Sequence, residues 1–304
     1  MNIIDKILSH SVLVKKPIVI VHIGSEGSNL DYWKKISKNS ILISIDGNLN
    51  KKKNKNSFIK VIDIKNIISD KNGYSFFYQT KDSHCSSLLM PNDEEVNKWY
   101  GGHRFKVVKK EKVKTVTVND LLKRIGINYI DWLTIDAQGM DLKIFKSINP
   151  KIKKEISVID IEPGFFPFYR NEEKVSEVFR YMDIFFEFSD IKFGENYKVE
   201  SKQLTSFDKK ILFKYDKPTK IYSNITYVNK FSKNLRVILI KIIYLMLNNK
   251  LFEIKNMIYK HKKNSFLKVI EKKINYKIFL NKIYYIFALP MTITKKIIKN
   301  IIKF

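Results

Sequence analysis

Four apolar runs in this chain end in residues that could bind or act on a ligand. These residues are Gly24, Ser25, Glu26 and Gly27 after the first run, Asp46 after the second, Asp136 and Gln138 after the third, and Glu162 after the fourth. A glycine-rich turn lets the backbone approach a ligand and offers N–H donors where a helix begins. A carboxylate there can accept hydrogen bonds from ribose hydroxyls, face a cationic centre or act as a base. Each feature alone could be a turn or a helix cap, but their recurrence favours one ligand site.

The apolar runs are short and alternate with helical patterns, which is typical of a parallel, doubly wound sheet. Ligands of such sheets bind beyond the carboxyl ends of the strands. We therefore predict an α/β fold with a doubly wound, mostly parallel, Rossmann-like sheet. The expected strands are residues 17–24, 41–48, 58–64, 131–136 and 156–162, the expected helices are 28–37, 119–126 and 140–148, and the expected edge pair is 184–193 with 209–215.

The C-terminal part of the chain has a different pattern, because only helical runs follow Tyr227. We predict a helical arm at residues 1–16, the α/β domain at residues 17–220, and a basic, all-helical extension at residues 221–304. The length of 304 residues suffices for one large domain or for one domain with a smaller appendage.

Positive charge is concentrated in the C-terminal extension. The chain has a net charge of +27, and residues 230–304 hold 18 Lys and Arg residues against Glu253 and Glu271. Such a charge favours a polyanionic partner, nucleic acid or an anionic membrane, although a Lys-rich composition alone could also produce it. In residues 292–304, isoleucines at helical spacing alternate with lysines. This basic amphipathic pattern predicts either attachment to an anionic leaflet or packing on the α/β domain.

The sequence also limits the redox and membrane context. Cys85 is the only cysteine, so an intramolecular disulfide and a multi-cysteine metal site are excluded. No uninterrupted apolar run approaches the ~20 residues that cross a bilayer. The first residues lack the pattern of a secretory signal. We expect a cytoplasmic protein, peripheral on the inner face of the membrane if the C-terminal helices bind lipid.

The run from Trp132 to Ile148, WLTIDAQGMDLKIFKSI, resembles the central signature of FkbM-type methyltransferases. Further stretches resemble that family in the same order within about residues 17–215: VHIGSEG, ISIDGN, IISDKNGYSFFY, SSLLMP, VTVNDLL and ISVIDIEPGFFPFY. Two positions depart from the family pattern. His22 stands where the family usually has Asp, and Thr134 stands where Lys is common.

The resemblance implies a class I methyltransferase fold for residues 17–220 and methyl transfer from S-adenosylmethionine to a hydroxyl oxygen. Family members usually modify natural products or surface glycans, which implies a sugar hydroxyl of a surface glycan or lipid-linked saccharide as acceptor. The implied cofactor-binding residues are Gly24, Ser25, Glu26, Gly27, Asp46, Asp70, Asp136 and Gln138. The implied acceptor-binding residues are Ser86, Ser87 and Glu162.

Two side chains are candidates for the catalytic step. Asp136 follows the central strand and would lie beside the reacting centre. His103 could act as a general base, because a neutral imidazole titrates near the working pH. We expect no dedicated metal site, since no ligands have tight spacing, although the scattered acids leave a divalent metal open.

Two other classes of protein share part of this pattern. A nucleotide-dependent oxidoreductase would also use a glycine turn and an acid after the second strand, but would not need the IDAQGMD run around Asp136. A non-catalytic protein that binds nucleic acid or an anionic membrane on a Rossmann-like scaffold would explain the charge. An acid-lined sheet edge is a poor site for nucleic acid, so we expect a hydroxyl-bearing acceptor instead.

Overall fold

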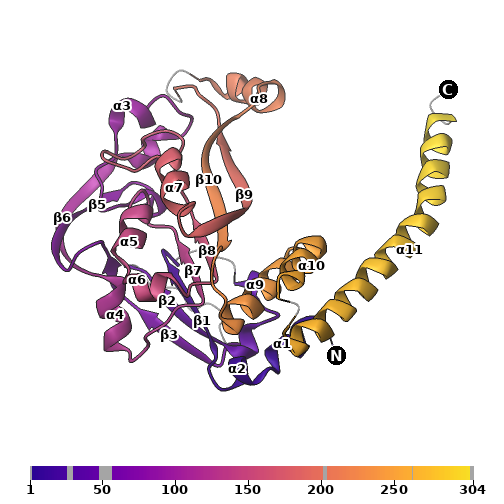
Figure 1. Ribbon diagram of the computed structural model, residues 1–304. Helices are drawn as coiled ribbons and strands as arrows, with labels where there is room; N and C mark the ends of the chain where they lie inside the picture. The colour runs from indigo at the N-terminus through magenta and orange to yellow at the C-terminus, as the bar shows by residue number, and fades with distance from the viewer. Residues whose placement is uncertain (1, 26–29, 48–56, 201–203, 262, 302–304) are drawn as a thin grey trace. The chain divides into compact units, whose positions relative to one another are not determined.

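The computed structural model describes residues 2–25, 30–47, 57–200, 204–261 and 263–301, with backbone alone from residue 285 onward. Its largest sheet has seven strands in the order β3-β2-β1-β7-β8-β10-β9 (Figure 1). They are β1 (Ile18–Ile23), β2 (Ser40–Ile45), β3 (Lys60–Ile64), β7 (Trp132–Ile135), β8 (Val158–Ile161), β9 (Phe186–Asn196) and β10 (Thr219–Asn229). The strands from β3 to β8 in this order are parallel, and β10 is antiparallel to both of its neighbours. The predicted mostly parallel α/β fold is confirmed.

The central strand β1 is buried along its whole length. Its sequence, IVIVHI, is a nearly continuous apolar run rich in β-branched residues. Such a run suits a strand that is covered on both faces, since β-branched side chains pack well on a pleated surface. β1 therefore lies in the middle of the sheet, between β2 and β7.

Helices α4 (Val118–Arg124), α5 (Asp141–Ser147) and α7 (Val175–Met182) bury apolar side chains in the same core cluster as one face of the sheet. The first of them begins where the Thr117 hydroxyl accepts a hydrogen bond from the Asp120 N–H. It ends before Gly126, which has a φ of +70° and so adopts the left-handed conformation that terminates helices. These helices fix the ends of the strands that precede them.

A second sheet has three strands in the order β4-β6-β5. They are β4 (Ile67–Ile68), β5 (Gly73–Thr80) and β6 (Val107–Val116), and β5 is antiparallel to β6. The segment between β5 and β6 contains the 3-10 turns η3 (Ser83–Cys85) and η4 (Gly102–Phe105) and the helix α3 (Asp93–Val96). Two of its residues, Ser86 and Ser87, were predicted to bind the acceptor.

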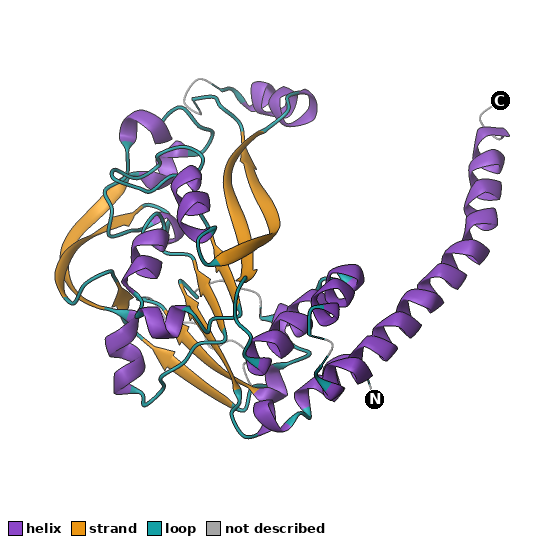
Figure 2. Cartoon of the chain, viewed as in Figure 1, coloured by secondary structure: helices purple, strands orange, loops and turns teal. Residues whose placement is uncertain are grey.

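Three local predictions are wrong. The extension predicted to be all-helical from residue 221 begins within β10, which is a strand of the main sheet. Residues 184–193 do not pair with 209–215, because β9 pairs with β10 instead and Ser206–Tyr215 form helix α8 (Figure 2). This helix begins at a capping box, in which Thr205 and Asp208 each accept a hydrogen bond from the other's backbone N–H. The helix predicted at 28–37 is reduced, in its described part, to the 3-10 turns η1 (Asp31–Trp33) and η2 (Ser37–Asn39).

Contacts divide the chain into two compact units, residues 10–241 and residues 1–9 with 242–304. The short helices α1 (Ile3–Leu8) and α2 (Ser11–Val14) precede β1, and α6 (Pro150–Lys153) precedes β8. Helices α9 (Leu235–Leu247), α10 (Leu251–Tyr259) and α11 (Ser265–Ile301) follow β10. Among the described helices, none combines the length and apolarity that crossing a bilayer requires.

A buried ion pair joins Asp131, which directly precedes β7, to Arg236 in α9, which follows β10. Asp131 and Arg236 are 2% and 7% exposed, and two guanidinium nitrogens of Arg236 lie 2.8 and 2.6 Å from the two carboxylate oxygens. The same guanidinium donates to the carbonyls of Val12, Lys16 and Pro17, and Asp131 also accepts the Val19 N–H. Burial raises the pKa of Asp131, and Arg236 opposes that shift.

We predict that Arg236→Met lowers the free energy of unfolding of the full chain by about 3–5 kcal/mol, because it leaves the Asp131 carboxylate buried without its cation. Chemical denaturation measures this loss. Arg124→Met, which removes an exposed guanidinium from α4, is the matched control and should change stability by less than about 0.5 kcal/mol. Equal losses in the two variants would contradict a structural role for the buried pair.

Candidate functional site

The parallel register places four of the predicted site residues in one row. The strand ends that lie opposite one another are Ile45, Ile23, Ile135 and Ile161. The residues that follow these strands are Asp46, Gly24, Asp136 and Glu162. The row therefore forms the carboxyl edge of the sheet, where ligands of open α/β sheets bind.

Gly24 allows the closest approach in this row. Its φ is +74°, and a Cβ atom built on it would lie 1.9 Å from the carbonyl oxygen of Asp136. Its N–H donates to the carbonyl of Ile45, and the Asp136 N–H donates to the carbonyl of Ile23. Any other residue at position 24 would force β1 and β7 apart, so glycine is required by the sheet edge itself.

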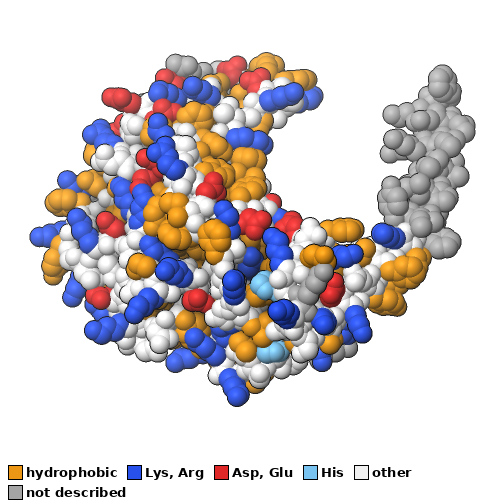
Figure 3. Space-filling model, in the orientation of Figure 1, with side chains coloured by type: hydrophobic (Ala, Val, Ile, Leu, Met, Phe, Trp, Pro, Cys, Tyr) orange, Lys and Arg blue, Asp and Glu red, His pale blue; other side chains and the backbone are white. Residues whose placement is uncertain are grey.

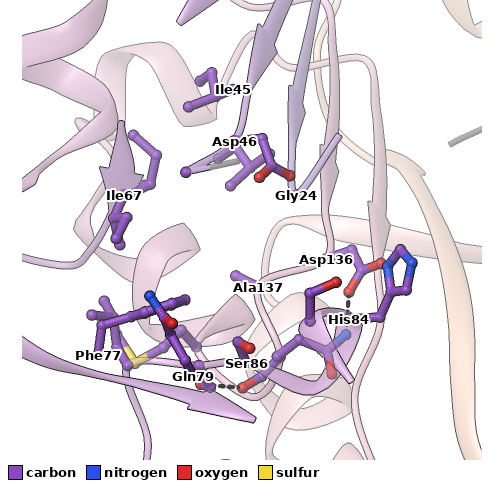
Figure 4. Close-up of a pocket in the computed structure, with 18 of the residues that line it drawn as sticks. Gly24, Ile45, Asp46, Ile67, Phe77, Gln79, His84, Ser86, Asp136 and Ala137 are labelled. Carbon is purple, nitrogen blue, oxygen red and sulfur yellow. Dashed lines mark hydrogen bonds between the residues drawn. The ribbon is translucent and has the colours of Figure 1, made fainter. Parts of the chain in front are cut away.

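A cavity of about 490 Å³ opens beside this row (Figure 4). Its apolar lining includes Ile45, Ile67, Ile68, Phe77 and Met140. Its acidic lining consists of Asp46, Glu111 and Asp136, and none of the described lining residues is Lys or Arg. The volume lies in the usual range for small-molecule and cofactor sites, and the charge of the lining favours a cationic ligand.

Asp136 and Glu162 form a carboxyl pair at the centre of the row. Burial raises the pKa of Asp136. Burial, and then the negative charge of Asp136, raise the pKa of Glu162 to about 10. The hydrogen bond between them raises the pKa of Glu162 and lowers that of Asp136, so Glu162 holds the proton and Asp136 carries the charge.

Gln138 orients the Asp136 carboxylate. Its Nε2 donates to Oδ1 of Asp136 at 2.8 Å, and the Tyr169 hydroxyl lies 2.9 Å from its Oε1 and from the carbonyl oxygen of Cys85. Its backbone is held in the left-handed region, with a φ of 50°, and its carbonyl accepts the Ser87 hydroxyl at 2.7 Å. Strained backbone of this kind is typical of functional turns.

Asp141 has a structural role, as its place in the first turn of α5 suggests. It is 3% exposed, and its two carboxylate oxygens accept the N–H groups of Ala137 and Gly139 at 3.3 and 3.2 Å. Burial, followed by the charge of Asp136, raises its pKa well above the ordinary value. Asp141 thus closes the turn that carries Gln138.

The structure brings together most, but not all, of the residues predicted to form the site. The predicted residues that line the cavity are Gly24, Asp46, Ser86, Ser87, Asp136 and Gln138. Ser25 is buried beside Ser44, 2.7 Å between hydroxyls, while Glu26 and Gly27 lie outside the described residues. Asp70 and His103 are exposed and are not part of the cavity lining.

His84 was not among the residues predicted to form the site. It lines the cavity, and its imidazole lies beside the Asp136 carboxylate in Figure 4. Gln79 and Glu111, which are hydrogen-bonded to each other across β5 and β6, also line the cavity. The alternation of side chains along β5 predicts that Phe77 and Gln79 share one face of the strand. The sequence does not indicate which of the two faces of β5 lines the cavity.

The described residues contain no group of three or more His, Cys, Asp or Glu side chains arranged to hold a metal ion. The carboxyl pair is instead held by neutral donors and by its shared proton.

We predict that Glu162→Gln makes the stability of the chain less dependent on pH. The folded-state pKa of Glu162 lies near 10, above its ordinary value of 4.5, so the native state holds an extra proton between these values. That stability is fully present below pH 4.5 and is lost as the pH rises through about 10. Melting temperatures of parent and variant should agree at acidic pH and diverge at alkaline pH, where the parent melts lower. Parallel curves throughout would mean that Glu162 does not hold this proton.

Comparison with known proteins agrees with this geometry. The model of the methyltransferase FkbM domain matches residues 19–198, which is more than half of the chain and includes β2, β7, β8 and all of β1 except Ile18. No curated protein and no solved structure matched the sequence. With the matched region carrying the whole carboxyl row and its cavity, the chain belongs to the FkbM methyltransferase family.

Proposed function

We propose that this protein transfers a methyl group from S-adenosylmethionine to a hydroxyl oxygen. The observation that carries the proposal is the charge of the cavity. The chain contains 57 Lys and Arg residues, yet the described lining has three carboxylates and no basic residue other than His84. A cationic cofactor with a sulfonium and an ammonium group suits this lining, whereas the pyrophosphate of a dinucleotide does not. The lining thus argues against the oxidoreductase alternative.

The donor set fits the parts of this cofactor. Asp46 follows β2, where a carboxylate can accept hydrogen bonds from both ribose hydroxyls. Ile45, Ile67 and Phe77 offer apolar contacts to a base. Asp136 would face the cationic methionine part.

The chemistry that the bound cofactor supplies is an electrophilic methyl group. The protein has to align the acceptor hydroxyl with that group and to remove the hydroxyl proton. Asp136 keeps its charge because Gln138 donates to it and Glu162 holds the shared proton. His84 stands beside Asp136 and is exposed, so it can take the acceptor proton and release it to water. We assign His84 to the role that the sequence suggested for His103.

A sugar hydroxyl of a surface glycan or lipid-linked saccharide is the acceptor class that we favour. Three aromatic side chains lie on the segments next to Glu162: Phe165, Phe193 and Tyr222. The rings of Phe165 and Phe193 are 5.9 Å apart, and Tyr222 is 40% exposed. Aromatic faces beside polar groups suit a ring with both apolar and hydroxyl edges. Mass spectrometry of the host's surface glycan, with and without the gene, tests this acceptor class.

An anionic membrane and a divalent metal are further proposed partners. Attachment of residues 292–304 to an anionic leaflet rests on sequence alone, because their side chains lie outside the described residues. A cytoplasmic location, peripheral on the inner membrane face, would suit a lipid-linked acceptor. A contribution of a divalent metal to turnover likewise remains open to direct assay with a chelator.

We predict that Asp46→Ala weakens binding of S-adenosylmethionine by about 1.5–3 kcal/mol, the usual cost of losing hydrogen bonds to a charged group. Calorimetry measures the affinity. Glu94→Ala removes an exposed carboxylate that does not line the cavity, and should bind like the parent. NAD should bind none of the proteins. Unchanged affinity of Asp46→Ala would remove Asp46 from the cofactor site.

We predict that His84→Asn lowers kcat for methyl transfer to a glycan preparation by about 10²–10⁴-fold, because the general base is lost, without changing cofactor affinity. His103→Asn is the matched variant and should react at the parent rate. The reverse pattern, a slow His103 variant with a fast His84 variant, would return the role of base to His103.

A further inference from the structure

The outward face of the β5–β6 ribbon carries aromatic and basic side chains in alternation. The register places Tyr74 opposite Lys114, Phe76 opposite Lys112 and Tyr78 opposite Lys110. We call these six residues the outer β5–β6 face. Since alternate residues of a strand share a face, all six side chains point to the same side of the ribbon.

Two of these three aromatic side chains are largely exposed, and Tyr78 is half-buried. Tyr74 is 66% exposed and Phe76 is 52% exposed. Large apolar groups gathered on one surface usually mark an interaction site. In Figure 3, blue and orange side chains lie next to one another along the edge where Figure 1 draws β5 and β6.

The charge on this face has one sign. In the part of the chain that the structure describes, Lys110, Lys112 and Lys114 form no ion pair with a carboxylate. Their neighbour Lys109, which points the other way, is paired with Glu111. The three lysines on the outer face therefore present an uncompensated positive charge to solvent.

The opposite face of the same ribbon already has a role. Phe77, Gln79 and Glu111 line the cavity, and the carboxylate of Glu111 is satisfied there by Gln79 and Lys109. The ribbon is thus a wall with the cofactor cavity on one side. The proposed methyl transfer uses only the inner side, and leaves the exposed aromatic–lysine face without a function.

We propose that the outer β5–β6 face binds the headgroups of an anionic phospholipid surface. Lysine stems lie along apolar groups while their ammonium groups reach phosphates, and aromatic rings favour the interface between headgroups and acyl chains. This surface lies within the unit of residues 10–241, whereas residues 292–304 belong to the other unit.

The geometry of the rings favours lipid over single-stranded nucleic acid. A base would need an open ring face on which to stack. Here the Nζ of Lys110 lies 4.1 Å from the centroid of the Phe76 ring, and the Nζ of Lys112 lies 5.1 Å from that of Tyr74. A base could stack there only by displacing an ammonium group, whereas a headgroup phosphate can bind the ammonium where it stands and leave the ring edges to the lipid.

The test is sedimentation of the full chain with vesicles of phosphatidylglycerol and phosphatidylcholine, and with phosphatidylcholine alone, at low salt. The triple variant Lys110→Gln, Lys112→Gln, Lys114→Gln should partition onto the anionic vesicles on the order of a hundredfold more weakly than the parent. The control is the triple variant Lys123→Gln, Lys151→Gln, Lys154→Gln. It removes the same charge from exposed positions on α4, on α6 and directly after α6, and should bind within about twofold of the parent. A second variant, Tyr74→Ser with Phe76→Ser, keeps the charge and should lose the part of binding that survives high salt.

Three results would overturn the proposal. The two lysine triples could weaken binding equally, which would show a response to net charge alone. The outer-face triple could bind anionic vesicles as the parent does. Alternatively, it could lose binding to oligo(dT) while its vesicle binding is unchanged, which would make the face a nucleic-acid site. Binding of S-adenosylmethionine and the melting temperature report whether each variant is folded.

Discussion

The site depends on the register between four parallel strands. β2, β1, β7 and β8 end at the same level, so the residue that follows each strand falls in one row: Asp46, Gly24, Asp136 and Glu162. The row exists only because Gly24 has no side chain where the backbone of Asp136 passes. Backbone N–H groups of Gly24, Asp46 and Asp136 then donate hydrogen bonds to the ends of neighbouring strands, which holds the edge together. Everything that the cavity can do follows from this alignment, because it brings two carboxyl groups close enough to share a proton.

The proton between Glu162 and Asp136 is held there because both carboxyl groups are buried. Two neighbouring carboxylates in a buried edge cannot both ionise without a large cost. Glu162 therefore stays protonated and donates to Asp136, while Gln138 supplies a second donor from the other side. The arrangement leaves Asp136 charged in a cavity whose other described acids are Asp46 and Glu111, of which Glu111 is paired with Lys109. In a strongly basic protein, this places acidic side chains together at one edge of the sheet, where the described lining holds no Lys or Arg.

The sequence could predict the edge residues but not how they are connected. Apolar runs that end in an acid or a glycine indicated Asp46, Asp136, Glu162 and Gly24, since such runs form strands and their ends meet at one edge. The contact of Gln138 with Tyr169 joins residues 31 apart, and the place of His84 depends on the segment between β5 and β6. No local pattern encodes such pairings. The predicted partner of β9 was wrong for the same reason. β9 pairs with β10, and helix α8 lies between these two strands in the sequence.

The ion pair between Asp131 and Arg236 has a consequence for how the protein is made. The sheet combines early strands with late ones, and the central neighbour of β1 is β7, more than a hundred residues away. The cation that neutralises the base of β7 comes later still, at position 236. A growing chain on the ribosome would therefore expose a half-finished sheet until most of the polypeptide has emerged. The apolar surface of this unfinished sheet stays exposed until the last of these contacts becomes available, and such surface is prone to aggregation.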